Sequence, residues 1–393
     1  MFYLDNAATS WPKPESVYQT LDQSFRSLFS PKRGTASASR LGANKLMEAR
    51  EVIAHLIGAT GQDASERIIF TSGATHSLNL AIQAFPWQAG DGVVISAMEH
   101  HALSRPVRKM VAEKGIQLHI VPYTTELPYD LVALESILKA NPSIKMVATT
   151  HASNVIGSIV PVEAVCQLAK QYGKVTLVDA AQSAGVLPLS VTQWGVDLMA
   201  LPGHKSLYGP PGVGVLWISP EASLNTFMEG GTGNDSGKHE MHATCPDGFE
   251  VGTINMPSIL ALAEGVRWVQ ETGVEKIHAH EIALLEMLLA GLNQLEGLTV
   301  YGHQRLSEKT PVVSFNLQGV PPKILGETLF NEFGIALRAG FHCAPMAHEC
   351  LGTIPLGGTV RASLGYFTQP EDVEALISAL KQTIQQGLCQ QPA

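Results

Sequence analysis

The stretch Leu201-Pro-Gly-His-Lys-Ser-Leu-Tyr-Gly-Pro-Pro211 directly follows an apolar run and places Lys205 in a loop after an expected strand. An earlier apolar run, Val175-Thr-Leu-Val-Asp179, ends on a carboxylate. A carbonyl cofactor needs an amine that forms a Schiff base and a carboxylate that keeps its ring nitrogen protonated. The pairing of Asp179 with Lys205 therefore favours pyridoxal 5′-phosphate. Each residue alone is equally typical of a loop lysine or a helix cap.

The chain around this stretch alternates short β-rich runs with amphipathic helical patterns, such as the one at 161–172. Such alternation predicts an α/β fold with a mainly parallel sheet covered by helices on both faces. Ligands of such sheets collect at the carboxyl ends of the strands, where Asp179 and Lys205 fall. The expected strands are 67–71, 92–96, 117–121, 145–149, 175–179, 197–201 and 212–217.

The pattern changes after about Pro257, where one long helix is expected to run to about Leu295. Short strands at 299–301, 312–317 and 336–338 and a final helix from Pro370 follow, which predicts a smaller α+β domain. We expect a large domain at 15–260 and a small domain formed by 1–14 and 261–393. The Gly- and His-rich stretch 230–246 is typical of a mobile loop.

Composition limits the function classes. The chain has 393 residues, 45% of them apolar, with a formal net charge of −9 and no basic stripe, which argues against a nucleic-acid partner. No apolar run approaches the roughly 20 residues that span a bilayer, and Met-Phe-Tyr-Leu-Asp5 lacks the pattern of a secretory leader. We therefore expect no membrane partner and a cytoplasmic location. Five cysteines make a disulfide framework improbable and suggest a reactive thiol.

Two further segments follow expected strands. Phe70-Thr-Ser-Gly-Ala-Thr-His-Ser-Leu-Asn79 opens a helix with the N–H groups and hydroxyls that a phosphate requires, although a well-capped helix without a ligand has the same pattern. The predicted phosphate cup is Ser72, Gly73, Ala74 and Thr75. In Ser96-Ala-Met-Glu-His-His-Ala102, the His100 imidazole is placed to stack on a flat cofactor ring. No carboxylate or cysteine stands at a familiar zinc spacing from it, so we expect no metal.

Ordered motifs run through nearly the whole chain. They are Tyr3-Leu-Asp-Asn-Ala-Ala-Thr9, Arg33-Gly34, Thr71-Ser-Gly-Ala-Thr75, Glu99-His-His-Ala102, Ser153-Asn-Val-Ile-Gly157, Asp179-Ala-Ala-Gln182, Gly203-His-Lys205, Glu250-Val-Gly-Thr253, Arg338-Ala-Gly-Phe-His-Cys343 and Arg361-Ala-Ser363. With them the chain resembles the pyridoxal-phosphate enzymes of the class V aminotransferase fold. Within that fold it resembles the cysteine desulfurases, specifically the group II branch that includes selenocysteine lyases. The resemblance implies fold type I.

The resemblance also implies roles for individual residues. Lys205 would form the Schiff base, Asp179 would contact the pyridine nitrogen, and Gln182 the ring hydroxyl. His100 would stack on the ring. Further cofactor contacts would come from Thr75, His204, Asn154 and, across a homodimer, Thr253 of the neighbouring subunit. The substrate residues would be Arg361, a guanidinium clamp for the α-carboxylate, with Asn154 and Ala7.

Cys343 decides which reaction is expected. In a cysteine desulfurase a protein thiolate attacks the sulfur of L-cysteine, leaving L-alanine and an enzyme persulfide for sulfur donation, for example to iron–sulfur cluster assembly. His342 and Arg338 lie close in sequence and would favour the thiolate if they face it. An inert structural cysteine is the alternative. A second alternative is a zinc site formed by His342, Cys343, His348 and Cys350, although the spacing of these residues matches no usual zinc site.

Several positions depart from the family pattern. Pro202 and Ala74 replace residues whose hydroxyls commonly contact the phosphate, His76 stands where glutamate is frequent, and Ile254 where proline is frequent. Two other functions therefore stay open. One is a C–S or C–Se lyase that acts on cystine or L-selenocysteine without needing Cys343. The other is a catalytically weak sulfur-relay or assembly partner. If the chain is a cysteine desulfurase, a sulfur-acceptor protein is an expected partner.

Overall fold

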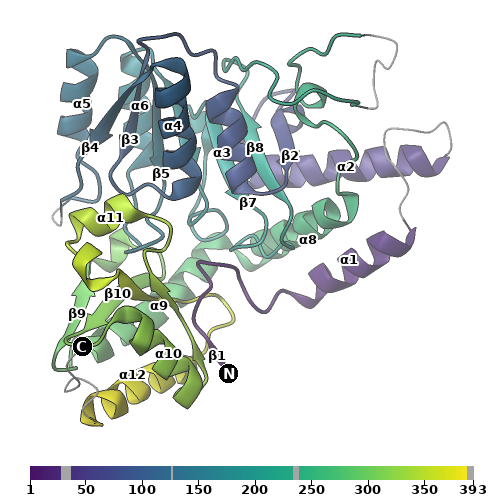
Figure 1. The fold of residues 1–393 in the computed structure, drawn as a ribbon. Helices are drawn as coiled ribbons and strands as arrows, with labels where there is room; N and C mark the ends of the chain where they lie inside the picture. The colour runs from purple at the N-terminus through teal and green to yellow at the C-terminus, as the bar shows by residue number, and fades with distance from the viewer. Residues whose placement is uncertain (28–36, 125–126, 233–238, 387–393) are drawn as a thin grey trace.

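A computed structural model describes residues 1–27, 37–124, 127–232 and 239–386 (Figure 1). Its centre is a seven-stranded sheet in which only β8 runs antiparallel to its neighbours, so the predicted mainly parallel sheet is confirmed. In spatial order the strands are β2 (Ile68–Thr71), β8 (Gly214–Ile218), β7 (Leu198–Pro202), β6 (Val175–Asp179), β5 (Ile144–Thr150), β3 (Gly92–Ser96) and β4 (Gln117–Val121).

Both faces of this sheet are buried. Met199 and Leu201 of β7 point into one core, whereas Leu198 and Ala200 point into the other, as the two-residue period of a strand requires. The first core is covered by α2 (Ser37–Leu56), α5 (Leu131–Ala140), α6 (Val162–Gln171), the short α7 (Val191–Trp194) and α8 (Met256–Thr272). The second core lies under α3 (Ala74–Gln83) and α4 (His101–Lys114). Helix α1 (Glu15–Ser27) packs against α8 (Figure 1).

The second unit has a four-stranded antiparallel sheet in the order β12 (Arg338–Gly340), β13 (Thr359–Ser363), β10 (Val312–Leu317) and β9 (Leu298–Tyr301). A separate apolar core joins it to α9 (Val274–Leu292), α10 (Pro322–Phe333) and α12 (Pro370–Gln385). β1 (Phe2–Tyr3) pairs with β11 (Ile335–Ala336) beside it. The remaining elements are α11 (Pro345–Cys350), η1 (Ser65–Arg67), η2 (Asp247–Phe249), η3 (Leu306–Glu308) and η4 (Ile354–Leu356).

The single long helix expected after Pro257 is wrong, because α8 ends and α9 begins at Gly273, whose φ of 92° lies outside the helical range. Leu262 and Val266 of α8 belong to the core of the large sheet. Leu4, near the N-terminus, packs in the core of the smaller unit. The division into a large domain at 15–260 and a small domain formed by 1–14 and 261–393 stays a proposal, although the start of α8 after residue 260 packs on the large sheet.

Two sequence expectations fall partly on residues outside the described ranges. Arg33-Gly34 lies among them, as do residues 233–238 of the expected loop 230–246, whose described flanks carry no helix or strand. Within the described ranges, no helix has the length and apolar content needed to cross a bilayer.

Candidate active site

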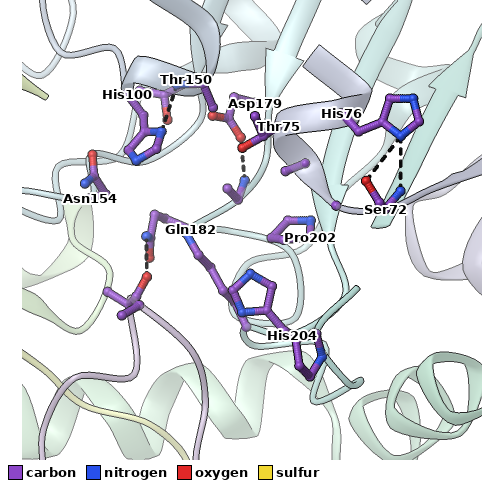
Figure 2. A pocket seen from close by; sticks show the side chains of 18 of the residues that line it. Ser72, Thr75, His76, His100, Thr150, Asn154, Asp179, Gln182, Pro202 and His204 are labelled. Atoms are coloured by element: carbon purple, nitrogen blue, oxygen red, sulfur yellow. Dashed lines mark hydrogen bonds between the residues drawn. The ribbon is translucent and has the colours of Figure 1, made fainter. Parts of the chain in front are cut away.

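A cavity of about 350 Å³ opens at the carboxyl ends of the parallel strands (Figure 2). Five segments meet there because each follows the end of a strand: 72–75 after β2, His100 after β3, Asn154 after β5, Asp179 at the end of β6, and His204-Lys205 after β7. All of the sequence-predicted site residues line this cavity except Cys343 and Thr253. Arg338, expected near Cys343, lines it too, as do Pro202 and His76, which depart from the family pattern; the lining residues that the sequence did not single out are Ala8, Ala102, Thr150, Ala181, Pro211 and Gly212.

Lys205 and Asp179 hold opposite charges in the floor of the cavity. Burial lowers the pKa of Lys205 to about 8; Asp179 opposes this shift, and the cations Arg361 and Arg338 add to it. Burial likewise raises the pKa of Asp179, opposed by Lys205 and by a 2.9 Å hydrogen bond from the Ala181 N–H. A lysine with a lowered pKa supplies a neutral amine, the nucleophilic form, far more readily than an exposed one.

The predicted phosphate cup lies at the start of α3. Gly73 precedes the helix with a φ of 150° and no capping side chain, so the first N–H groups of the helix remain available. Gly214 of β8 permits this turn, because a Cβ there would stand 2.5 Å from the Gly73 Cα. Ser72 and Thr75 are exposed, and His76 contacts the Ser72 hydroxyl at 3.3 Å (Figure 2).

His100 enters the cavity as a neutral ring. Burial, followed by the charge of Lys205, lowers the pKa of His100 to about 3. Its Nδ1 accepts a 3.0 Å hydrogen bond from the Ala102 N–H, so the proton of the neutral ring lies on Nε2. Burial also lowers the pKa of His204 to about 4. Gln182 donates to the Ala7 carbonyl at 3.0 Å, which ties the cavity wall to the N-terminal segment.

That N-terminal segment fixes the lysine loop, and sequence patterns did not reveal this role. The Ser10 hydroxyl donates to the Lys205 carbonyl at 2.8 Å, and the Lys13 ammonium donates to the His204 carbonyl at 2.7 Å. Burial lowers the pKa of Lys13 to about 8. In the sequence, this role is indicated only by a hydroxyl and an ammonium group among turn residues. Such groups are common in loops, so they do not predict the contact with the lysine loop.

Arg361 on β13 is almost fully buried beside the cavity. Its Nη2 forms a 2.6 Å ion pair with Asp5, and its Nη1 donates to the Asn154 carbonyl at 3.0 Å. Arg361 lines the cavity, and its buried Nε has no hydrogen-bond partner among the described residues. The Asn154 amide donates to the His342 carbonyl at 2.7 Å and so holds the cysteine segment.

Cys343 lies at the edge of the cavity, where its sulfur is 3.4 Å from the Arg338 Nη2. His342 and Cys343 both have a positive φ, 47° and 59°, and this turn sends the His342 ring into the core, where it contacts the Thr359 hydroxyl at 2.9 Å. Burial holds the pKa of His342 well below its ordinary value. Of the two neighbours expected to favour the thiolate, Arg338 is therefore the one beside the sulfur.

Two other expectations concern residues away from the cavity. His348 contacts the Thr353 hydroxyl at 2.7 Å, and in the described parts of the chain no three His, Cys, Asp or Glu side chains converge as metal ligands. The predicted zinc alternative thus has no assembled ligand set there. Thr253 is exposed and does not line the cavity of its own chain, so its contact with a neighbouring subunit stays a prediction.

Comparisons with known proteins agree on one family. Residues 2–376 match the sequence model of the class V aminotransferases. A probable cysteine desulfurase of Pyrococcus abyssi is 32% identical over 98% of this chain and 94% of its own. A probable cysteine desulfurase of Mycolicibacterium paratuberculosis is 34% identical over 98% of this chain. That relative is longer, and the match covers 56% of it. The apo structure of a cysteine desulfurase from Thermococcus onnurineus superposes with a TM-score of 0.87 at 31% identity, covering 98% of this chain and 95% of that one.

The fold and the site thus define a class V aminotransferase of fold type I. Within that class, the chain belongs to the cysteine desulfurase family. Proteins of the class use pyridoxal 5′-phosphate, and the cavity fits this group. It joins the half-buried amine of Lys205 and the buried carboxylate of Asp179 to an uncapped helix start at which Ser72 and Thr75 are exposed. Assignment to group II stays a prediction.

Proposed function

We propose that this protein is an L-cysteine desulfurase that forms L-alanine and holds the released sulfur on Cys343 as a persulfide. One observation carries the proposal. The Cys343 sulfur contacts Arg338, which itself lines the cavity that contains Lys205, Asp179 and Arg361. The contact places a cysteine sulfur, the nucleophile that a persulfide mechanism requires, next to the residues of that cavity.

The proposed cofactor site uses the residues of the cavity. Lys205 would hold pyridoxal 5′-phosphate covalently, Asp179 would face its ring nitrogen, Gln182 its ring hydroxyl, and His100 its ring face. The phosphate would lie at the start of α3 with Ser72, Gly73, Ala74 and Thr75, assisted by His204 and Asn154. When bound, the cofactor supplies a sink for electrons from the substrate α-carbon.

Arg361 would bind the substrate α-carboxylate, because its guanidinium lines the cavity together with Ala7 and Asn154. Asp5 holds the far side of the guanidinium and thus orients it. The Cys343 thiolate would then attack the substrate sulfur. An S–S bond forms, the substrate C–S bond breaks, and its electron pair stays on the carbon, which takes up a proton to give L-alanine.

Two residues would move protons. The Lys205 amine, once free, has a pKa near 8 and would take and return the α-carbon proton at neutral pH. The His100 Nε2–H is a donor next to the same space, because the ring is neutral and its Nδ1 is occupied. We include His100 as the group that donates to or orients the product.

Alanine and sulfide release from L-cysteine tests the proposal, with added cofactor and a thiol reductant. Loss of both products in Cys343→Ala and in Lys205→Ala supports it. Loss only in Lys205→Ala favours a lyase for cystine or L-selenocysteine that does not need Cys343. A wild-type protein that stays colourless with added cofactor favours the relay or assembly partner. Cys343→Ser is a matched control that keeps the size of the side chain.

The proposal includes a homodimer, in which Thr253 of the neighbouring subunit would complete the phosphate site. It also includes a sulfur acceptor and a cytoplasmic location, as the composition indicates. Sedimentation equilibrium tests the dimer. A mixed sample of Thr253→Ala and Lys205→Ala subunits tests the shared site, because only the hybrid would contain one intact site.

A further inference from the structure

A second, more open cavity of about 390 Å³ adjoins the cofactor cavity and is lined by Cys343. Its walls are α3, α4 and the cysteine segment, and α3 and α4 run side by side in Figure 1. Thr75, His100 and Ala102 line both cavities, whereas Cys343 lines only the second. Cys343 therefore belongs to the second cavity, and its sulfur contacts Arg338, which lines the first.

Helix α4 gives the second cavity a positive charge. Arg105 and Lys109 line it, and no aspartate or glutamate does. Arg105 is exposed and makes no hydrogen bond or ion pair within the described ranges. Lys109 donates to the neutral Gln83 at 2.7 Å and lies 4.0 Å from Glu113. The third cation of the helix, Arg108, contacts the neutral Met346 sulfur at 3.4 Å.

The start of α4 also contacts the Cys343 backbone. The His101 N–H, at the start of α4, donates to the Cys343 carbonyl at 2.7 Å and so anchors the cysteine to this helix. Burial, Arg105 and Arg108 together lower the pKa of His101, in agreement with cations that face the same end of the helix. In a chain with a net charge of −9, a cavity lined by Arg105, which has no acidic partner among the described residues, and by Lys109, which is paired with Glu113 only at 4.0 Å, would attract an anionic ligand to Cys343.

We propose that this second cavity binds the sulfur acceptor and selects a small thiol that carries carboxylates. The inference rests on the proposed persulfide at Cys343. A volume of about 390 Å³ suits a small molecule, and Arg105 and Lys109 would bind its carboxylates. The acceptor thiolate attacks the terminal sulfur of the persulfide, a new S–S bond forms, the bond to Cys343 breaks, and Cys343 leaves as a thiolate. No net oxidation occurs.

A first test needs neither cofactor nor persulfide. Cys343 is alkylated with the anion iodoacetate and with neutral iodoacetamide, and each rate is read by mass spectrometry of the Cys343 peptide. We expect the iodoacetate-to-iodoacetamide ratio to fall about tenfold in Arg105→Gln/Lys109→Gln. The matched control is Lys114→Gln, because Lys114 ends the same helix but does not line the cavity. Raising the salt concentration should lower the wild-type ratio. An unchanged ratio in the double variant overturns the proposal.

A second test follows discharge of the persulfide formed with L-cysteine. The acceptors are mercaptosuccinate, 2-mercaptoethanol and cysteamine. The discharge rate of each thiol with the protein is divided by its rate with the persulfide of a free peptide that contains Cys343. We expect mercaptosuccinate to be fastest in the wild type and to lose about tenfold in the double variant. Equal normalised rates, or discharge by an acidic polypeptide alone, refute a small-molecule site. Failure to form any persulfide refutes the proposed function instead, and the alkylation ratio still reports on the cavity.

Discussion

The amine of Lys205 is expected to titrate near pH 8, and two substitutions should move its pKa in opposite directions. Burial lowers this pKa, Asp179 raises it, and Arg361 lowers it further. Arg361→Gln removes a cation and should therefore raise the pKa of Lys205. Asp179→Asn removes a carboxylate and should lower it. Because both changes lie in one cavity and nearly preserve size, general loosening of the fold would not produce opposite shifts.

The size of the effect follows from the two pKa values. An ordinary lysine has a pKa of 10.5 and Lys205 one of about 8, so Lys205 has about 300 times more neutral amine at pH 7. A charge within about 4–6 Å shifts a pKa by about 1 to 3 units. We take the low end, and expect a midpoint about one unit higher in Arg361→Gln and about one unit lower in Asp179→Asn.

Competitive labelling measures this titration without cofactor. The apo protein is first labelled with trace acetic anhydride at a series of pH values between 6 and 10.5. All remaining amines are then acetylated with an isotopic form of the reagent. Mass spectrometry of the Lys205 peptide gives the ratio of the two labels at each pH. Lys139 is the internal reference, because its hydrogen bond and ion pair with Glu135 raise its pKa. A Lys205 midpoint that coincides with that of Lys139 refutes the reasoning. So does a downward shift in Arg361→Gln.

Three further outcomes are expected. Arg361→Gln should raise the KM for L-cysteine by about 30- to 100-fold, with a smaller effect on kcat, because the charge-assisted carboxylate contact is lost; steady-state alanine release measures this. Glu250→Ala should lower the free energy of unfolding in urea by about 3–5 kcal/mol, because it leaves the buried charge of Arg50, 2.6 Å from Glu250, without its partner. The double variant with Arg50→Met should recover most of that loss. A loss below about 1 kcal/mol in Glu250→Ala would contradict the pairing. Burial lowers the pKa of Lys309 to about 8, so the folded state binds fewer protons than the unfolded state between about pH 8 and 10.5, and stability rises with pH there. In Lys309→Met the slope of the unfolding free energy over that window should fall by up to about 1.4 kcal/mol per pH unit, and an unchanged slope would show that Lys309 does not titrate there.

The sheet was predictable because its strands are almost wholly apolar. Most of its runs, such as 175–179, are buried, so hydrophobicity marks them; the edge strand β4 is partly exposed and was recognised although it contains Gln117 and His119. Strand β13 was missed because it is polar in sequence, Thr-Val-Arg-Ala-Ser, although every residue in it is buried. Arg361 is tolerated there only because Asp5 and the Asn154 carbonyl, both distant in sequence, satisfy it. The sequence around Arg361 gives no indication of partners that lie so far away in the chain.

Part of the cavity lining was also predictable from local pattern, because 72–75, His100, Asp179 and Lys205 lie at or after strand ends that could be recognised, whereas Ala7 and Arg361 were expected only from the family resemblance. The direction of side chains within an irregular turn was not. His342 and Arg338 were equal candidates for the neighbour of Cys343, and two consecutive residues with positive φ decide between them. Residues other than glycine rarely adopt that conformation, so sequence favours no turn of this kind.

The N-terminal segment connects the two halves of the proposed chemistry. Asp5 pairs with Arg361 in the smaller sheet, and the Ala7 N–H donates to the Ser363 hydroxyl at 2.9 Å in the same strand. A few residues later Ser10 and Lys13 hold the backbone of the lysine loop after β7. One short stretch therefore sets the position of the carboxylate clamp relative to the amine. Since a bound amino acid must reach both groups at once, we infer that the spacing between them depends on residues 5–13 as much as on either sheet.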